Sequence, residues 1–174
     1  MTDHYMGNPN VKGDGVTQPW TEHDVREYAK CMQDPAYFAR TYVKIISLDK
    51  GLVNFNLYDY QEKMFEHFAD NRFSIVLACR QSGKSISSVV YLLWYAIFHP
   101  EKTIAVLANK GATAREMLAR VTLALENLPF FLQPGCRALN KGSIEFSNNS
   151  RILAAATSGS SIRGMSVNLL FLDE

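Results

Sequence analysis

The stretch FSIVLACRQSGKS, residues 73–85, decides the fold expected for this chain of 174 residues. It opens with a short apolar run, residues 73–78, whose β-branched side chains are typical of a strand buried in a parallel sheet. It ends with Gly-Lys-Ser at residues 83–85, where a long apolar segment, residues 84–98, begins and is expected to be a helix. A strand, a turn that ends in Gly-Lys-Ser and a helix in this order are typical of a Walker A phosphate-binding loop.

The chemistry of such a loop depends on its backbone and on two side chains. Backbone N–H groups of the turn and of the helix N-terminus would point at phosphate. Lys84 would reach the β- and γ-phosphates of ATP, and the Ser85 hydroxyl would coordinate Mg²⁺. Ala78 stands where the pattern expects its first glycine, which weakens the match. The alternative is an ordinary strand-to-helix turn that uses Gly83 for its backbone freedom.

A second motif lies about ninety residues further on, where the apolar run NLLFL ends in Asp173 and Glu174. An apolar strand that ends in two acids is typical of a Walker B element. Beside the strand of the Walker A loop, Asp173 would hold Mg²⁺ and Glu174 would orient or deprotonate the attacking water. The alternative is a strand that runs out into solvated acids. Because the two motifs complement each other, the sequence predicts ATP and Mg²⁺ as cofactors.

The rest of the chain predicts an α/β fold, a P-loop NTPase with a central, mainly parallel sheet flanked by helices. Further helices are expected at residues 21–32, 36–42, 57–68 and 111–127, strands at 103–108, 143–146, 151–156 and 168–172, and a small hairpin within 43–55. We expect the chain to have three parts. They are a flexible leader without regular structure (1–20), a small helical and extended lead-in (21–56), and the P-loop core (57–174).

Composition narrows the possible functions. With 18 basic and 17 acidic residues, the chain has no overall charge that would attract nucleic acid, so any DNA contact must be local or made by an assembly. Cys31, Cys79 and Cys136 match neither a zinc site nor a disulfide framework, and we expect free thiols in a reducing compartment. No apolar stretch approaches the length of a membrane span, and a signal peptide is not expected.

Four stretches carry a resemblance to a known family. They are the loop with Arg-Gln ahead of SGKS (80–85), LYDYQ (57–61), the segment from residues 105 to 144, and SIRG (161–164). With these motifs the chain resembles the N-terminal ATPase part of the large terminase subunit of tailed bacteriophages, especially T-even-like phages. The resemblance extends over much of the chain.

The resemblance implies roles for individual residues. Tyr60 and Gln61 would contact the adenine base, although packing of Tyr60 in a helix and a solvated Gln61 are the alternatives. Arg80 would act as an arginine finger in cis, unless it is a surface arginine or only positions the loop. With the motifs, the expected nucleotide contacts are Tyr60, Gln61, Arg80, Gln81, Ser82, Gly83, Lys84, Ser85 and Asp173, the metal ligands Ser85 and Asp173, and the catalytic residues Glu174, Arg80 and Lys84.

Basic residues outside the two motifs are harder to assign. Arg163 would couple the nucleotide state to a neighbouring subunit or to DNA, or would make a plain salt bridge. Lys110, Arg115 and Arg120 would touch DNA phosphates, or would simply be solvated on a helix face.

The family implies an ATP-driven motor that moves double-stranded DNA into the procapsid. Its partners would be the portal protein and the small terminase subunit, with a homo-oligomeric ring in the cytoplasm of the infected host, at the procapsid portal. The alternatives are a helicase or restriction-type translocase, and a nucleotide-binding fragment without turnover. The coupling motif, last strands and nuclease domain of the family are not present, so we expect a core truncated after the Walker B strand, poorly soluble and inactive when isolated.

Overall fold

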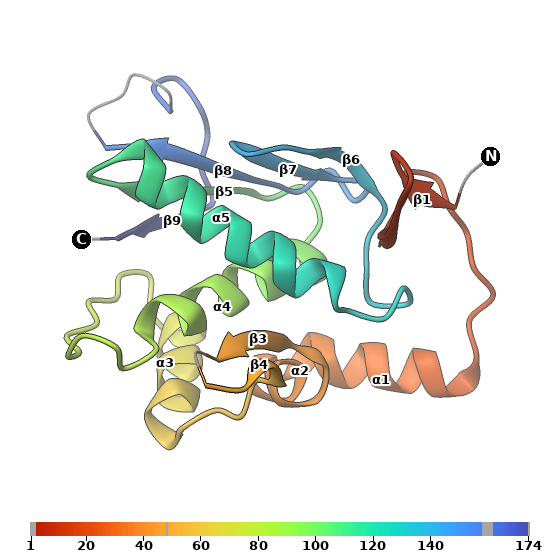
Figure 1. Cartoon of the computed structure of the whole chain (residues 1–174), viewed down its shortest axis with the longest axis horizontal. Helices are drawn as coiled ribbons and strands as arrows, with labels where there is room; N and C mark the ends of the chain where they lie inside the picture. The colour runs from red at the N-terminus through yellow and green to blue at the C-terminus, as the bar shows by residue number, and fades with distance from the viewer. Residues whose placement is uncertain (1–2, 48, 158–161, 174) are drawn as a thin grey trace.

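The computed structural model describes residues 3–47, 49–157 and 162–173, and its main sheet is a five-stranded mixed sheet that runs along one side of the molecule (Figure 1). The strands are arranged in the order β6 (Cys136–Leu139), β7 (Ser143–Phe146), β8 (Arg151–Ala156), β5 (Thr103–Ala108) and β9 (Leu169–Leu172). Strands β8, β5 and β9 are parallel, whereas β6, β7 and β8 pair antiparallel. The α/β prediction is confirmed, with β6 as a strand that the sequence analysis missed.

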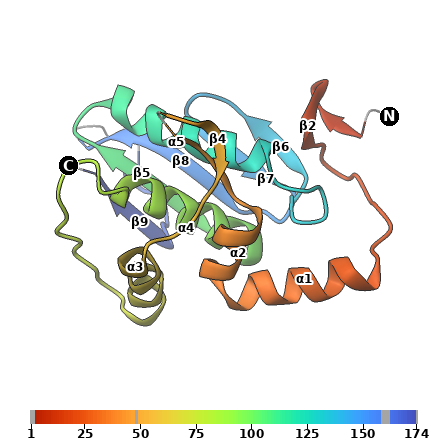
Figure 2. The ribbon, with the colours of Figure 1, turned by 60° about the horizontal axis from the view of Figure 1, so that its bottom comes forward.

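Two long helices pack with this sheet. Helix α5 (Gly111–Glu126) runs along one face and contacts β5 and β8, and α4 (Lys84–Phe98) packs against α5 (Figures 1 and 2). Nearly every side chain of α4 from Ser87 onward is buried, as its uniformly apolar sequence leads one to expect. The bounds predicted for α4 are confirmed, and those of α5 differ by one residue.

The lead-in of residues 21–56 contains the helices and the hairpin that were expected there, and it is tied to α4. They are α1 (Glu22–Gln33), α2 (Pro35–Tyr42) and the hairpin of β3 (Lys44–Ser47) and β4 (Gly51–Asn54). Helix α3 (Asp59–Asp70) follows, two residues later at each end than predicted. A capping box between Thr21 and Asp24, with hydrogen bonds of 2.9 and 3.1 Å, starts α1. The indole N–H of Trp94 in α4 donates to the carbonyl of Cys31 at 2.7 Å, which joins α1 to the core.

The prediction of no regular structure in the leader is wrong. Residues 4–12 form a hairpin of β1 (His4–Tyr5) and β2 (Asn8–Lys12), and Val11 is buried in the core. The Gln133 amide holds this hairpin, because it accepts from the backbone N–H of Lys12 and donates to the carbonyl of Asn10, both at 3.0 Å. These partners lie over 100 residues apart, so local composition did not reveal them.

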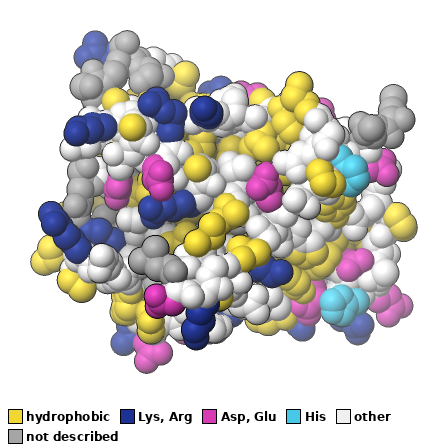
Figure 3. Space-filling model, viewed as in Figure 1, with side chains coloured by type: hydrophobic (Ala, Val, Ile, Leu, Met, Phe, Trp, Pro, Cys, Tyr) yellow, Lys and Arg dark blue, Asp and Glu magenta, His cyan; other side chains and the backbone are white. Residues whose placement is uncertain are grey.

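The prediction of a buried strand at residues 73–78 is also wrong. The segment belongs to no strand of the sheet, and Phe73, Ile75 and Leu77 are 82%, 96% and 100% exposed. Figure 3 shows hydrophobic side chains on the surface where Figure 1 draws this part of the chain. The physical reason is that no strand lies beside the segment in the described structure, and an apolar run forms a buried strand only between neighbours.

Candidate nucleotide-binding site

The turn before α4 has an unusual backbone, with two residues in the left-handed region. Gly83 is the N-cap of α4 in the left-handed conformation, with φ of +85°, and Gln81 also has a positive φ of 60°. The Ser87 hydroxyl donates to the Gly83 carbonyl at 3.0 Å, and the Ser82 hydroxyl donates to the Cys79 carbonyl at 2.9 Å. These bonds stabilise the curved backbone from both sides of Gly83.

Lys84 and Ser85 occupy the first turn of α4, where the sequence analysis expected them. The first N–H groups of a helix have no partner within the helix, and the helix dipole places partial positive charge there. Both residues are half-buried. A cation, a hydroxyl and N–H groups therefore meet at one helix end, which is the combination that binds phosphate and a metal ion.

Tyr60 and Gln61 reach this turn from α3. The Tyr60 hydroxyl donates to the Ser82 carbonyl, and burial raises the pKa of Tyr60, so that it stays a donor. Gln61 is 1% exposed; its amide donates to the Gly83 carbonyl at 3.5 Å and accepts from the Tyr58 N–H at 2.8 Å. The alternative prediction of a solvated Gln61 is therefore wrong. Both residues hold the loop in place, while their contact with a base stays a prediction.

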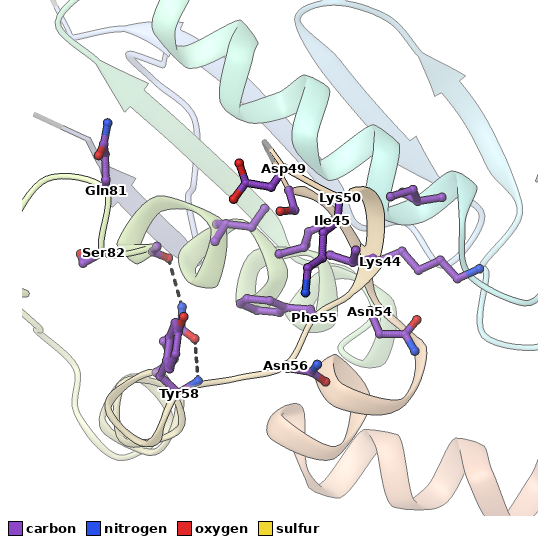
Figure 4. A pocket seen from close by; sticks show the side chains of 16 residues that line it. Lys44, Ile45, Asp49, Lys50, Asn54, Phe55, Asn56, Tyr58, Gln81 and Ser82 are labelled. Atoms are coloured by element: carbon purple, nitrogen blue, oxygen red, sulfur yellow. Dashed lines mark hydrogen bonds between the residues drawn. The ribbon is translucent and has the colours of Figure 1, made fainter.

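A cleft of about 850 Å³ opens beside the loop (Figure 4). The β3–β4 hairpin forms one wall, and Tyr58, Gln81 and Ser82 belong to the opposite side. Lys44, Lys50 and Asp49 of the hairpin also line it, so the wall carries charges of both signs. The sequence analysis predicted this hairpin but no role for it, because its residues match no nucleotide motif.

The strand expected to be a Walker B element forms, but within the described residues the strand of the Walker A loop does not lie beside it. Strand β9 agrees with the prediction, and Asp173 follows it, half-buried, with its backbone N–H donating to the Leu107 carbonyl at 2.8 Å. Asp173 does not lie beside the strand of the Walker A loop, because β9 pairs with β5 and residues 73–78 form no strand. That part of the prediction is wrong. Glu174 and Ser161 lie outside the described residues.

The remaining basic candidates are dispersed. Arg80 is exposed in the loop, and Lys110 is exposed at the N-cap of α5. Arg115 and Arg163 are also exposed, and Arg120 forms an ion pair with Glu116 at 3.5 Å. The structure does not gather these side chains around the loop, and their roles stay predictions.

No helix of the described residues combines the length and the apolar character that crossing a membrane requires.

Comparison with known proteins identifies the family. The structure is similar to the crystal structure of the HK97 bacteriophage large terminase, with a TM-score of 0.67 and 16% sequence identity over 82% of this chain. The match spans only 31% of that terminase chain, and at this identity it shows the fold alone.

The family model described as terminase large subunit, T4likevirus-type, N-terminal, matches residues 75–174, which is more than half of the chain. The resemblance noted in the sequence is thereby confirmed. This chain belongs to the terminase large subunit family of the T4likevirus type, whose N-terminal part it matches.

Proposed function

We propose that this chain binds Mg²⁺ and ATP at residues 80–85 and is the ATPase motor part of a large terminase subunit, with a P-loop NTPase fold. One observation carries the proposal: the left-handed Gly83 places Lys84 and Ser85 in the first turn of α4, beside a cleft. Family membership supports it, because large terminase subunits are generally ATPases that package DNA.

The residues at the loop suit the triphosphate. Helix N–H groups would bind phosphate oxygens, and the Lys84 ammonium would neutralise their charge. Ser85 and Asp173 offer the hard oxygen ligands that Mg²⁺ prefers, and the ion would neutralise charge on the leaving phosphates. Arg80, exposed in the loop, would stabilise the transferring phosphoryl group, and Glu174 would activate water.

For the base we propose the cleft between the β3–β4 hairpin and the loop. Tyr58 is exposed and stacks on Tyr60, with ring centroids 5.9 Å apart, so an aromatic surface is available for a purine. Gln61 would position the loop rather than contact the base, because its amide is buried and already bonded.

At the level of the assembly we propose translocation of double-stranded DNA into a procapsid, in the host cytoplasm at the portal. A homo-oligomeric ring, the portal protein and the small terminase subunit would be the partners. The family match favours this role over a helicase or a restriction-type translocase.

The exposed thiol of Cys79 provides a direct test of ATP binding. Cys31 and Cys136 are buried, and burial raises their pKa values to about 12 and about 11, so a thiol reagent should modify Cys79 first. We expect Mg²⁺ with ATP to slow its alkylation, measured by mass spectrometry. Lys84→Ala should abolish this protection, while Lys110→Ala, at the N-cap of another helix, should retain it. Equal alkylation rates with and without saturating ATP would refute the proposal.

Binding without hydrolysis is the second candidate, and one observation favours it. Residues 73–78 are not paired in the sheet, so no strand pairing fixes Ser85 relative to Asp173. Because the isolated chain is expected to be inactive, release of phosphate from ATP is measured after a complementing C-terminal fragment is added, and it then separates the two candidates. A turnover that Glu174→Gln abolishes, with Cys79 protection retained, supports the motor; protection without any turnover supports the binding module.

A further inference from the structure

A second cleft lies at the far end of α4 from the loop. Its volume is about 410 Å³, within the range of roughly 300–1,000 Å³ that is common for small-molecule sites. Ile97 lines it near the C-terminal end of α4, whereas Gly83 of the loop caps the N-terminal end. A helix of 15 residues is about 22 Å long, and among the described residues the two clefts share no lining residue. Figure 1 accordingly places the β1–β2 hairpin and the residues that precede α4 at opposite ends of the molecule.

Lys12, the last residue of β2, brings a buried cation to this second cleft. It lines the cleft and is only 8% exposed. Burial lowers the pKa of its ammonium, and no described residue forms an ion pair or a hydrogen bond with that group. Buried charges are normally paired, because an ammonium loses its hydration on burial. An unpaired ammonium beside an open cleft is therefore suited to an anion that enters the cleft.

The backbone around Lys12 is held in place by the segment that leads into β6. The backbone N–H of Lys12 donates to the Gln133 side chain at 3.0 Å, and Gly13 pairs with Cys136 in a parallel bridge. The two segments approach so closely that a Cβ on Gly135 would lie 2.6 Å from the Gly13 carbonyl oxygen. The position of Lys12 at the cleft is thus set by the fold before any ligand binds.

The other charged groups of the cleft neutralise each other. Asp14 and Arg137 both line it and form an ion pair at 3.4 Å. The Arg137 guanidinium also donates to the Asn149 side chain at 2.6 Å and to the Ser147 carbonyl at 3.2 Å. The cleft therefore offers one net positive charge, that of Lys12.

The walls of the cleft are aromatic in large part. Trp20, Tyr28 and Phe131 line it, and the rings of Trp20 and Tyr28 meet edge to face with centroids 5.2 Å apart. Trp20 is 45% exposed, and Tyr28 and Phe131 are half-buried, so apolar ring surface remains open. Apolar walls with one charged group are the usual composition of a site for a small organic ligand.

We propose that this second cleft binds a carboxylate joined to an aromatic or aliphatic group. The carboxylate pairs with the Lys12 ammonium, and the apolar group packs against Trp20 and Phe131. A single negative charge matches the single net positive charge of the cleft. Phosphate is a poorer ligand, because it carries up to two charges, is usually bound by several donors, and would face Asp14. This inference does not depend on ATP binding at the loop.

Calorimetric titration of the full chain with 3-phenylpropionate tests the proposal. We expect the acid to bind, and its neutral amide, which has nearly the same shape, to bind at least about tenfold more weakly, because the amide forms no bond between charged groups. Inorganic phosphate should also bind more weakly than the acid. An acetylated tripeptide that ends in a phenylalanine carboxylate identifies the source of the ligand. Tighter binding of the tripeptide indicates the C-terminus of a polypeptide, and tighter binding of 3-phenylpropionate indicates a free acid.

Matched variants assign the binding to Lys12. Lys12→Met keeps the length of the side chain and removes an unpaired buried charge, so it should fold, which circular dichroism verifies. It should weaken binding of the acid at least about tenfold and leave binding of the amide unchanged. Lys63→Met, at an exposed lysine on α3, should change neither. Trp20→Ala should weaken binding of the acid and the amide alike, because it removes apolar contact only.

Four results would overturn the proposal. They are failure of the acid to bind, equal affinities for the acid and the amide, tighter binding of phosphate than of the acid, and unchanged affinity for the acid in Lys12→Met. The first three are measured on the unmodified chain, so they do not depend on the folding of any variant.

Discussion

Replacing Gly83 by alanine tests whether the loop geometry is held by two separate constraints. The first is backbone strain, because an L-residue at the left-handed φ of +85° costs about 1–2 kcal/mol. The second is steric, because a Cβ at this position would lie 2.8 Å from Nε2 of Gln61. Since Gln61 is buried, it must shift and weaken its bond with the Tyr58 N–H, which costs a further 0.5–1.5 kcal/mol, roughly.

Gly51→Ala is the matched control. Gly51 also has a positive φ, of 69°, but a Cβ there would meet nothing within 4 Å. Both substitutions change the entropy of the unfolded chain alike, so that contribution cancels in the comparison. We expect Gly83→Ala to lower the free energy of unfolding by about 1.5–3.5 kcal/mol and Gly51→Ala by about 1–2 kcal/mol, so that the difference between them is the steric cost.

Urea denaturation followed by circular dichroism measures both values, and the pair is repeated in a Gln61→Ala background. Without the glutamine side chain, the cost of Gly83→Ala should fall to that of Gly51→Ala, because only the strain remains. Equal costs of the two substitutions in the unmodified chain would refute the steric part of the reasoning. An unchanged cost in the Gln61→Ala background would refute the assignment of the contact to Gln61.

Three further predictions concern the framework around the loop. Hydrogen bonds, the largest from Lys30, hold the pKa of Glu27 at about 2, against an ordinary value of 4.5. The stabilisation that this carboxylate provides is therefore present above pH 4.5 and should be lost as the pH falls towards 2. The urea midpoint should fall over this pH range, and Glu27→Gln should make the fall smaller. Gln133→Ala should lower the free energy of unfolding by about 1–3 kcal/mol and detach the β1–β2 hairpin, which faster proteolysis near the N-terminus would show. Unchanged protection of this region from protease would contradict the role of the Gln133 amide. Trp94→Phe removes the hydrogen bond to the Cys31 carbonyl and should lower the free energy of unfolding by about 1 kcal/mol in urea titrations. An unchanged free energy of unfolding would contradict the role of this bond.

Local signals in the sequence predicted most elements correctly. The start of α1 follows from the capping pair Thr21 and Asp24, and α4 follows from a glycine and a long apolar run. Strand β5 has the bounds that its apolar composition indicated. Each of these depends on residues close in sequence, which is why one sequence sufficed.

The features that the sequence did not predict involve partners far apart in the chain. The β1–β2 hairpin depends on Gln133, and the buried state of Gln61 depends on the turn at Gly83. The hairpin wall of the cleft has no motif, because its charged residues become relevant only when the chain brings the loop beside them. The motifs predicted candidate site residues whose roles stay predictions, whereas the tertiary structure showed that Gln61 contacts the loop.

The failure at residues 73–78 has a different meaning. An apolar, β-branched run predicts a strand through the burial it requires, so the prediction is a statement about neighbours as much as about the segment. Where the neighbours are present, as for β5 between β8 and β9, the same kind of sequence forms a strand as expected. At residues 73–78 the apolar side chains are exposed, and β9 is unpaired on the side away from β5. The disagreement between sequence and structure at residues 73–78 therefore concerns the neighbours that the segment needs, and not its own composition.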